Sequence, residues 1–239
     1  MTELLFRKDA YLREAQGAVR MITDEGGIVL DRTVFYPTSG GQPGDSGTLQ
    51  WNGGAIDVAT TIKGPNDSVV LIPAEPLPLP PVGQEVRQAI AFDRRHRLMR
   101  MHTALHLLSV VVPRPVTGGS IASERSRLDF DMETPPDDKN ALARTLNDLI
   151  ACDFAVTEEF ITEAELESSP GLVKTLSVQP PRGSGRIRLV RIGAGAAQVD
   201  LQPCGGTHVA RTGEIGRLRI AKIENKGKRN RRINIVFDE

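Results

Sequence analysis

The stretch LMRMHTALHLL, residues 98–108, decides the fold predicted for the second half of this chain. Apolar residues recur in it every three or four positions, at Leu98, Met101, Leu105 and Leu108. This spacing predicts one buried face of an α-helix, which Pro113 and Pro115 end. His102 and His106 stand four residues apart on this helix. They therefore project from one side, a turn apart, as two ligands of one metal ion require.

A second pair of metal-binding residues lies far downstream, in Cys204-Gly205-Gly206-Thr207-His208. The two glycines allow the backbone to bend around an ion. Thiolate and imidazole ligands together select a borderline-soft cation such as Zn²⁺. A histidine pair alone is more often a packed or solvated pair than a metal site. The second pair, which contains one of the chain's two cysteines, makes a metal site the favoured interpretation. We predict one Zn²⁺ per chain, held by His102, His106, Cys204 and His208.

Other chemistries at these residues have less support. Zinc peptidases carry His-Glu-x-x-His with the glutamate as general base, and here Thr103 stands in the glutamate's place. Cys204 could instead be a nucleophile paired with a histidine, which no sequence feature favours over metal binding. His96 lies among arginines and is expected at the surface. No disulfide is expected between Cys152 and Cys204.

The composition of the chain excludes several classes of protein. Its 239 residues are 39% hydrophobic and 25% charged, as in one or two globular domains rather than a disordered chain. Thirty basic and thirty acidic residues give a formal net charge of zero, which argues against nucleic-acid binding by overall charge. No stretch approaches the ~18 consecutive apolar residues of a membrane span, and no secretory signal is visible. We expect a cytoplasmic protein with no membrane partner.

Residues 1–89 are predicted to form a small antiparallel β-sheet or barrel. Short apolar runs alternate with turn formers, as in Ala18–Ile22, the turn Asp24–Gly27 and Ile28–Leu30. Prolines in Pro73–Pro81 favour an extended segment, and the domain boundary is placed after it, near residue 90. The glycine-rich segment Ser39–Gly47 lacks the pattern of either common nucleotide-binding loop, and it fits a tight turn between strands equally well.

Residues 90–239 are predicted to form helices packed on an antiparallel sheet, so that the chain as a whole is α+β. A second helix is expected from Thr134-Pro135 through Leu149, and Thr162–Glu165 has the form of a capping box. The strand-like runs are Phe154–Ile161, Arg186–Ile192, Ala197–Leu201, Gly216–Ile223 and Arg232–Phe237.

Charge is distributed unevenly along the chain. Residues 129–169 carry twelve acidic and two basic residues, whereas residues 211–239 carry nine basic and four acidic ones. A charge run usually marks a solvated face. The basic residues around one turn could nevertheless hold a phosphate backbone without making the whole protein basic.

Three motifs carry a resemblance to a known family: YPTSGGQPGD (residues 36–45), HTALHLL (102–108) and CGGTHV (204–209). Together they resemble the editing domain of alanyl-tRNA synthetase, and they are most similar to its freestanding relatives, the AlaX trans-editing proteins. The likeness continues through Thr212–Gly216 and Lys226–Arg232, in family order. It implies an N-terminal β-barrel-like domain with the glycine-rich motif, and a zinc-binding C-terminal domain that hydrolyses the ester of mischarged tRNA for alanine.

The resemblance implies a zinc-dependent deacylase that removes serine, or glycine, from tRNA for alanine. A zinc-bound water is the expected catalytic group if one of the four ligands is released to open a position; with all four bound at once, the site is closed and structural. No side-chain base is assigned, because the glutamine that follows the first helix in the synthetase's editing domain is absent from Val116–Ser120. Gly40, Gly41 and Asp45 are expected to shape the amino-acid pocket. The residues expected to hold acceptor-stem phosphates are Lys226, Lys228, Arg229, Arg231 and Arg232.

Selectivity for serine over alanine must come from polar groups, because alanine is smaller and fits wherever serine does. The candidates that could pair with the serine hydroxyl are Thr38, Ser39, Gln42 and Thr117. The glycine-rich motif is favoured, since it is polar and otherwise unexplained.

Two rival functions stay open at this point. One is a non-catalytic tRNA- or nucleic-acid-binding module with a structural zinc. The other is a zinc hydrolase that acts on free amino-acid esters. The synthetase itself is not expected, since no nucleotide-binding activation domain is found in the sequence.

Overall fold

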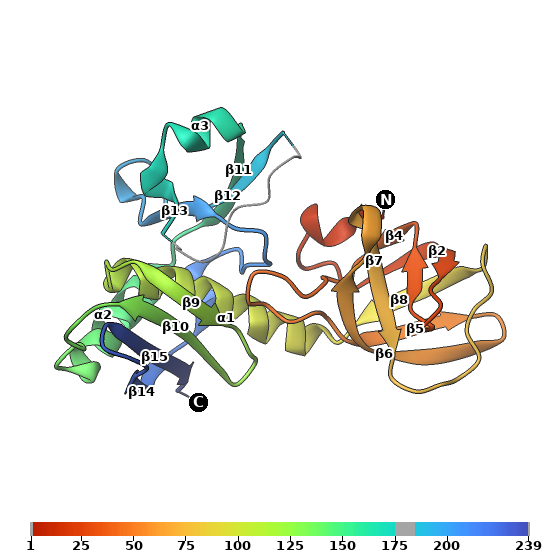
Figure 1. The fold of residues 1–239 in the computed structure, drawn as a ribbon, viewed down its shortest axis with the longest axis horizontal. Coiled ribbons are helices and arrows are strands. Elements are labelled where there is room, and N and C mark those ends of the chain that lie inside the picture. The colour runs from red at the N-terminus through yellow and green to blue at the C-terminus, as the bar shows by residue number, and fades with distance from the viewer. Residues whose placement is uncertain (1, 175–184, 239) are drawn as a thin grey trace. The chain divides into compact units, whose positions relative to one another are not determined.

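The computed structural model describes residues 2–174 and 185–238. The chain divides into two compact units, Met1–Arg97 and Leu98–Glu239 (Figure 1). Strands predominate in both units, and a few helices complete the mixed α and β fold. Within the described residues no helix combines the length and the apolar character needed to cross a membrane.

The first unit contains a closed, antiparallel six-stranded β-barrel, which confirms the barrel expected for this part of the chain (Figure 1). Around the barrel the strands follow the order β2 (Glu14–Ile22), β3 (Ile28–Leu30), β7 (Val69–Pro73), β6 (Gly54–Lys63), β5 (Gly47–Trp51) and β8 (Glu85–Ile90). Its core is built from fully buried aliphatic side chains such as Leu30, Leu49 and Leu71. The predicted turn between β2 and β3 is closed by the Thr23 N–H, which donates to the Gly27 carbonyl at 2.8 Å.

A short parallel pair, β1 (Glu3–Leu4) and β4 (Arg32–Thr33), accompanies the barrel. Helix α1 (Phe92–Val111) begins in the first unit and continues into the second. The boundary predicted near residue 90 therefore precedes the structural division. The reason is that the first turn of α1 is bound to the barrel unit, where the Arg94 guanidinium donates to the Gly44 carbonyl at 2.9 Å.

The second unit contains two antiparallel sheets. The four-stranded sheet has the order β14 (Leu218–Asn225), β15 (Asn230–Phe237), β10 (Arg125–Asp131) and β9 (Val116–Ser120). The three-stranded sheet has the order β11 (Val156–Ile161), β12 (Ile187–Ile192) and β13 (Asp200–Pro203). Four of the five predicted strands lie within two residues of their expected bounds. The strand expected from Ala197 starts later, because Gly195–Ala197 forms a 3-10 turn, and β9 and β10 were not predicted.

The prediction that the second helix begins at Thr134-Pro135 is wrong. Helix α2 covers Lys139–Ala151, and Asp138 is its N-cap, with the carboxylate accepting from the N–H groups of Asn140 and Ala141 at 2.7 and 3.0 Å. A proline disfavours the helical conformation of the residue before it, so Pro136 prevents a start at Pro135. Helix α3 (Glu163–Glu167) begins at Thr162, whose predicted capping box with Glu165 is confirmed.

Helix α2 packs on β14 through its apolar side, and a side-chain amide fixes their register. Asn147 Nδ2 donates to the carbonyl of Leu218 at 2.8 Å, and Asn147 Oδ1 accepts from the Leu218 N–H at 2.9 Å. Both backbone groups belong to the first residue of β14, which is an edge strand and pairs only with β15. The single amide therefore satisfies one donor and one acceptor that would otherwise be buried without partners.

Replacing Asn147 by alanine should lower the free energy of unfolding by ~1–3 kcal/mol, because two backbone groups of Leu218 lose their partners. The control is Asn140→Ala, at an exposed position of the same helix, which should change stability by less than ~0.5 kcal/mol. Denaturant melts of the two variants measure the difference. Equal stabilities would show that the amide does not hold α2 on the sheet.

Candidate metal centre

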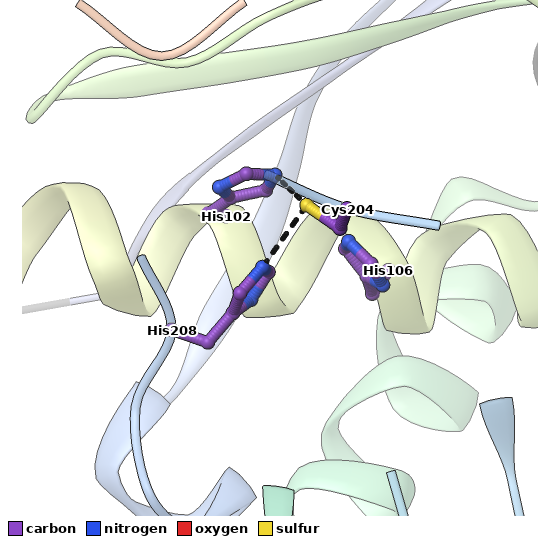
Figure 2. A group of neighbouring side chains, drawn as sticks. All are labelled: His102, His106, Cys204 and His208. Carbon is purple, nitrogen blue, oxygen red and sulfur yellow. Dashed lines mark hydrogen bonds between the residues drawn. The ribbon is translucent and has the colours of Figure 1, made fainter. Parts of the chain in front are cut away.

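The four predicted metal ligands meet at one point of the second unit (Figure 2). His102 and His106 project from α1, and Cys204 and His208 belong to the loop that follows β13. One potential ligand atom from each residue lies within 4.8 Å of the others. Cys204 Sγ is 3.4 Å from His102 Nε2 and 3.2 Å from His208 Nε2. The histidines are buried and the cysteine is half-buried, so the cluster is shielded from bulk water.

The hydroxyl of Thr103 determines which nitrogen of His208 faces the cluster. Thr103 Oγ1 lies 3.0 Å from the carbonyl of Met99, which can only accept, so its single proton points there. Toward His208 Nδ1, at 3.1 Å, Thr103 can then only accept a hydrogen bond. His208 therefore carries its proton on Nδ1, and the lone pair of Nε2 is directed at the cluster. Thr103 occupies the glutamate position of the zinc peptidase motif, and here it orients a ligand.

Asp200 orients His106 in the same way. Its Oδ2 accepts from His106 Nδ1 at 3.0 Å and from the Gln202 amide at 2.7 Å, while Lys174 pairs with Oδ1. Burial raises the pKa of Asp200, but His106 and Lys174 outweigh it and lower that pKa to about 2. The carboxylate is therefore ionised at neutral pH. A carboxylate behind a ligating imidazole fixes the ring and raises its basicity.

The electrostatics of the cluster favour the metal-binding protonation states of Cys204 and His208, but not that of His106. Burial raises the pKa of the Cys204 thiol, but His102 and His208 outweigh it and hold that pKa well below its usual range. Burial also lowers the pKa of His208. Burial opposes charge on His106 too, but Asp200 and Cys204 raise its pKa to about 9, so a cation that binds its Nε2 displaces a proton. Three imidazoles and one thiolate are the donor set and number that Zn²⁺ takes.

Replacing Thr103 by valine should weaken zinc affinity by ~10–100-fold, because the Nδ1–H of His208 loses its acceptor. Thr103→Ser keeps the hydroxyl and should keep affinity near that of the wild type. Competition with a chromophoric chelator measures both constants without any activity assay. Wild-type zinc affinity in the valine variant would show that Thr103 does not orient His208.

The glycine-rich motif forms a tight turn in the first unit. Ser39 and Gln42 exchange backbone hydrogen bonds at 3.0 and 2.9 Å, and Gly40 and Gly41 between them have φ angles of +57° and +84°. Two consecutive positive φ values are the geometry of a two-residue hairpin turn, which favours glycine at both places. The turn presents Gly40 and Gly41 at the surface, while the side chain of Gln42 is fully buried.

Asp45 and Thr38 have structural partners within the same unit. The Asp45 carboxylate pairs with the guanidinium of Arg95, both side chains being buried, and it accepts from the Tyr36 N–H at 2.6 Å. The Thr38 hydroxyl lies 3.2 Å from the Thr61 carbonyl and accepts from the Gly44 N–H at 2.8 Å. Both groups hold the glycine-rich loop against the barrel. Their hydrogen-bonding capacity is largely used there.

Thr117 differs from the other selectivity candidates. The β9–β10 register runs from Gly118 opposite Asp129 directly to Val116 opposite Phe130, so Thr117 is the extra residue of a β-bulge. Its Oγ1 is buried and has no hydrogen-bond partner in the part of the chain that the structure describes. Such a group is costly unless something pairs with it.

The basic residues near the C-terminus fall into two groups. Arg231 is buried, and its guanidinium donates to backbone carbonyls, including that of Gly227 at 2.8 Å. Arg232 pairs with Asp129, and Arg229 pairs with Asp131 and Glu133. Lys226 and Lys228 are exposed on the turn between β14 and β15. The two lysines are therefore better placed for phosphates than the buried arginine.

Sequence reasoning missed the residues that support the ligands, above all Asp200 and Gln202. The signal was present: Asp200, Gln202 and Cys204 alternate along β13 and its end, so they share one face of the strand. Gln202 donates to Asp200, and its amide also lies 3.4 Å from the hydroxyl of Ser109 on α1. The strand that delivers the cysteine thus also delivers the carboxylate.

The first unit is a β-barrel unit, and the second carries a buried histidine–cysteine cluster that could hold a metal ion; family models of aminoacyl-tRNA synthetase domains match segments of both. Residues 9–94 match the family model described as tRNA synthetases class II (A), and residues 187–234 match threonyl and alanyl tRNA synthetase second additional domain. The chain is 37% identical to an alanyl-tRNA editing protein AlaX-M of Methanosarcina acetivorans, over 98% of each chain. It is 34% identical to the AlaX-M protein of Saccharolobus solfataricus, again over 98% of both.

The chain belongs to the AlaX family of alanyl-tRNA editing proteins. It is also 34% identical to an alanine–tRNA ligase of Pyrobaculum arsenaticum, where 93% of this chain matches 25% of the ligase. The matched region thus corresponds to one portion of a much larger synthetase.

Proposed function

We propose that this chain is a zinc-dependent aminoacyl-tRNA deacylase that removes serine, or glycine, from tRNA for alanine. The observation that carries the proposal is the convergence of three imidazoles and one thiolate in a member of the AlaX family. Curated relatives are named as alanyl-tRNA editing proteins, which supports hydrolysis of an ester between an amino acid and tRNA.

His102, His106, Cys204 and His208 are the residues that would hold the zinc ion. When bound, the ion supplies a Lewis acid for the ester carbonyl or for the attacking water. Thr103 and Asp200 keep the ligand nitrogens of two histidines turned inward, as their hydrogen bonds require. Burial of the imidazoles lowers the local dielectric, which strengthens every electrostatic interaction in the site. Lys174 keeps Asp200 ionised behind its histidine.

Recognition of serine is proposed to rest on the hydroxyl of Thr117. This group is buried in the same unit as the metal ligands and lacks a partner among the described residues. The Thr38 hydroxyl, favoured from sequence, is already engaged by Thr61 and Gly44. Gly40, Gly41, Gln42 and Asp45 remain candidates for shaping the pocket, through the conformation of the loop that they form.

One experiment separates the proposal from its rivals. The protein is incubated with serine-charged and alanine-charged tRNA for alanine and with a free serine ester, each with and without a chelator. A deacylase of this class should release serine from tRNA quickly and alanine slowly, and should stop when the chelator removes zinc. Hydrolysis of the free ester at the same rate would indicate a general esterase. RNA binding without any hydrolysis would indicate a binding module.

A further inference from the structure

The four-stranded sheet of the second unit has one buried and one polar face. Leu128, Ile233 and Ile220 point to the buried side, where α2 packs on β14. The residues on the other face of the sheet are identified from the strand register. Arg125 on β10 pairs with Val236 on β15, and Val236 pairs with Arg219 on β14, so these three residues share that face. Along β10, β15 and β14 these outward positions are occupied by Arg125, Arg127, Asp129, Asp131, Asn230, Arg232, Asn234, Val236, Arg219, Lys222 and Glu224.

The outward face, defined by these positions, carries five basic residues and three acidic ones. Its acidic groups are already paired: Asp129 with Arg127 and Arg232, Asp131 with Arg229, and Glu224 with lysines. Arg125 and Arg219 are exposed and have no carboxylate partner among the residues that the structure describes. Lys226 and Lys228 extend the basic surface along the adjoining turn. The face therefore presents cations that internal carboxylates do not neutralise.

This basic face contrasts with one acidic stretch of the second unit. Residues 133–169, which include α2, β11 and α3, carry ten acidic and two basic residues. A polyanion approaching the unit is thus attracted to the outward face and repelled by this acidic stretch, whose acidic residues lie mostly outside α2. The zero net charge of the chain conceals this asymmetry.

The chemistry of the face selects among nucleic-acid structures. Sheets that bind single-stranded RNA carry aromatic side chains on which unpaired bases stack. None of the outward positions of β10, β15 and β14 holds an aromatic residue, and Phe130 and Phe237 are both buried. Arg125 and Arg219 flank β15 and are two strand spacings apart, about 10 Å between backbones. Their long side chains can reach different phosphates of one backbone.

We propose that the outward face of the β10–β15–β14 sheet holds the phosphate backbone of an RNA double helix, with Arg125 and Arg219 as principal contacts. This inference rests on the proposed function, since the stem of a charged tRNA is the double helix concerned. It moves the expected RNA contact from the turn alone to the whole sheet face, and it leaves Arg231 as a structural residue.

The test compares two double variants that each remove two positive charges from the second unit. Arg125→Ala with Arg219→Ala alters the face, and Lys139→Ala with Arg144→Ala alters exposed positions of α2. Binding is measured over a salt series with uncharged tRNA, an RNA hairpin stem and a single-stranded RNA. The face variant should bind tRNA and the hairpin about 10-fold more weakly, with a log–log salt slope shallower by about 2. The α2 variant should bind about as tightly as the wild type, because its two cations lie away from the face.

Wild-type affinity and slope in the face variant would overturn the inference, as would an equal loss of affinity for single-stranded RNA and for the hairpin. Zinc content and thermal melting, measured alongside, should be unchanged, because neither arginine contacts the core. The proposed function is judged separately, by serine release at saturating tRNA. If the wild type releases serine but the face variant binds RNA as tightly as the wild type, only the inference is refuted. If the face variant binds RNA more weakly but the wild type releases no serine, only the proposed function is refuted.

Discussion

Replacing Cys204 by alanine should weaken zinc binding by ~100-fold or more and reduce serine release from tRNA to the level of the chelated protein. Four-ligand zinc sites contribute ~10–16 kcal/mol, so one ligand accounts for roughly 3 kcal/mol, which is about two orders of magnitude in affinity. The substitution removes the Cys204 sulfur, which lies 3.2 Å from His208 Nε2 and 3.4 Å from His102 Nε2. Metal content after dialysis and the deacylation rate are the two measurements.

The matched control is Cys152→Ala, which removes the chain's other cysteine from an exposed position. It should retain one zinc per chain and full activity. If Cys204→Ala still held one zinc per chain, the ion would be bound elsewhere and the four-residue centre would be refuted. If the variant lost zinc but kept its rate, the metal would be structural and the deacylase would need another catalytic group.

The metal cluster could be predicted because each of its two ligand pairs lies within a short segment of the sequence. An i, i+4 histidine pair shares a helix face by geometry alone, and Cys204 and His208 need only a short glycine-containing loop to face the same point. What sequence could not supply was the support around the ligands. The roles of Thr103 and Asp200 depend on hydrogen bonds between segments about a hundred residues apart, since Thr103 meets His208 and Asp200 meets His106.

The unpredicted strands show a different limit. Val116–Ser120 contains two adjacent glycines, which are poor strand formers, and it is held as an edge strand by pairing with β10. In Arg125–Asp131 the alternation is real, with Leu128 and Phe130 inward, but the charged residues between them suggest a loop. The alternation can be recognised as a strand only once its pairing with β15 is known.

Buried arginines were the least accessible to sequence reasoning. Arg231 looked like one member of a basic cluster, yet it is buried because the carbonyls of its own turn and of Glu133 surround the guanidinium. Arg95, one of the three arginines in Arg94-Arg95-His96-Arg97, is fully buried for a similar reason, with Asp45 and the Val34 carbonyl as partners. Burial of a charge is decided by partners distant in the chain.

Replacing Thr117 by valine should lower the preference for serine over alanine by ~10–100-fold. Valine keeps the shape of threonine but removes the hydroxyl, so a serine hydroxyl in the pocket would be buried without its partner, at a cost of ~1–3 kcal/mol. Alanine has no hydroxyl to lose, so its hydrolysis should change little or rise. The measurement is the ratio of kcat/KM for serine-charged and alanine-charged tRNA for alanine, in protein with verified zinc content.

Two further variants decide where serine is read. Thr117→Ser restores a hydroxyl and should recover most of the preference. Thr38→Val should leave the ratio unchanged while lowering stability, because the Thr38 hydroxyl bonds to Thr61 and Gly44 in the barrel unit. The opposite result, with the ratio lost in Thr38→Val and kept in Thr117→Val, would assign selectivity to the glycine-rich motif. Alanine escapes hydrolysis only if some polar group binds more strongly to a hydroxyl than to a methyl group. Thr117 offers a buried hydroxyl for which the described residues provide no other use.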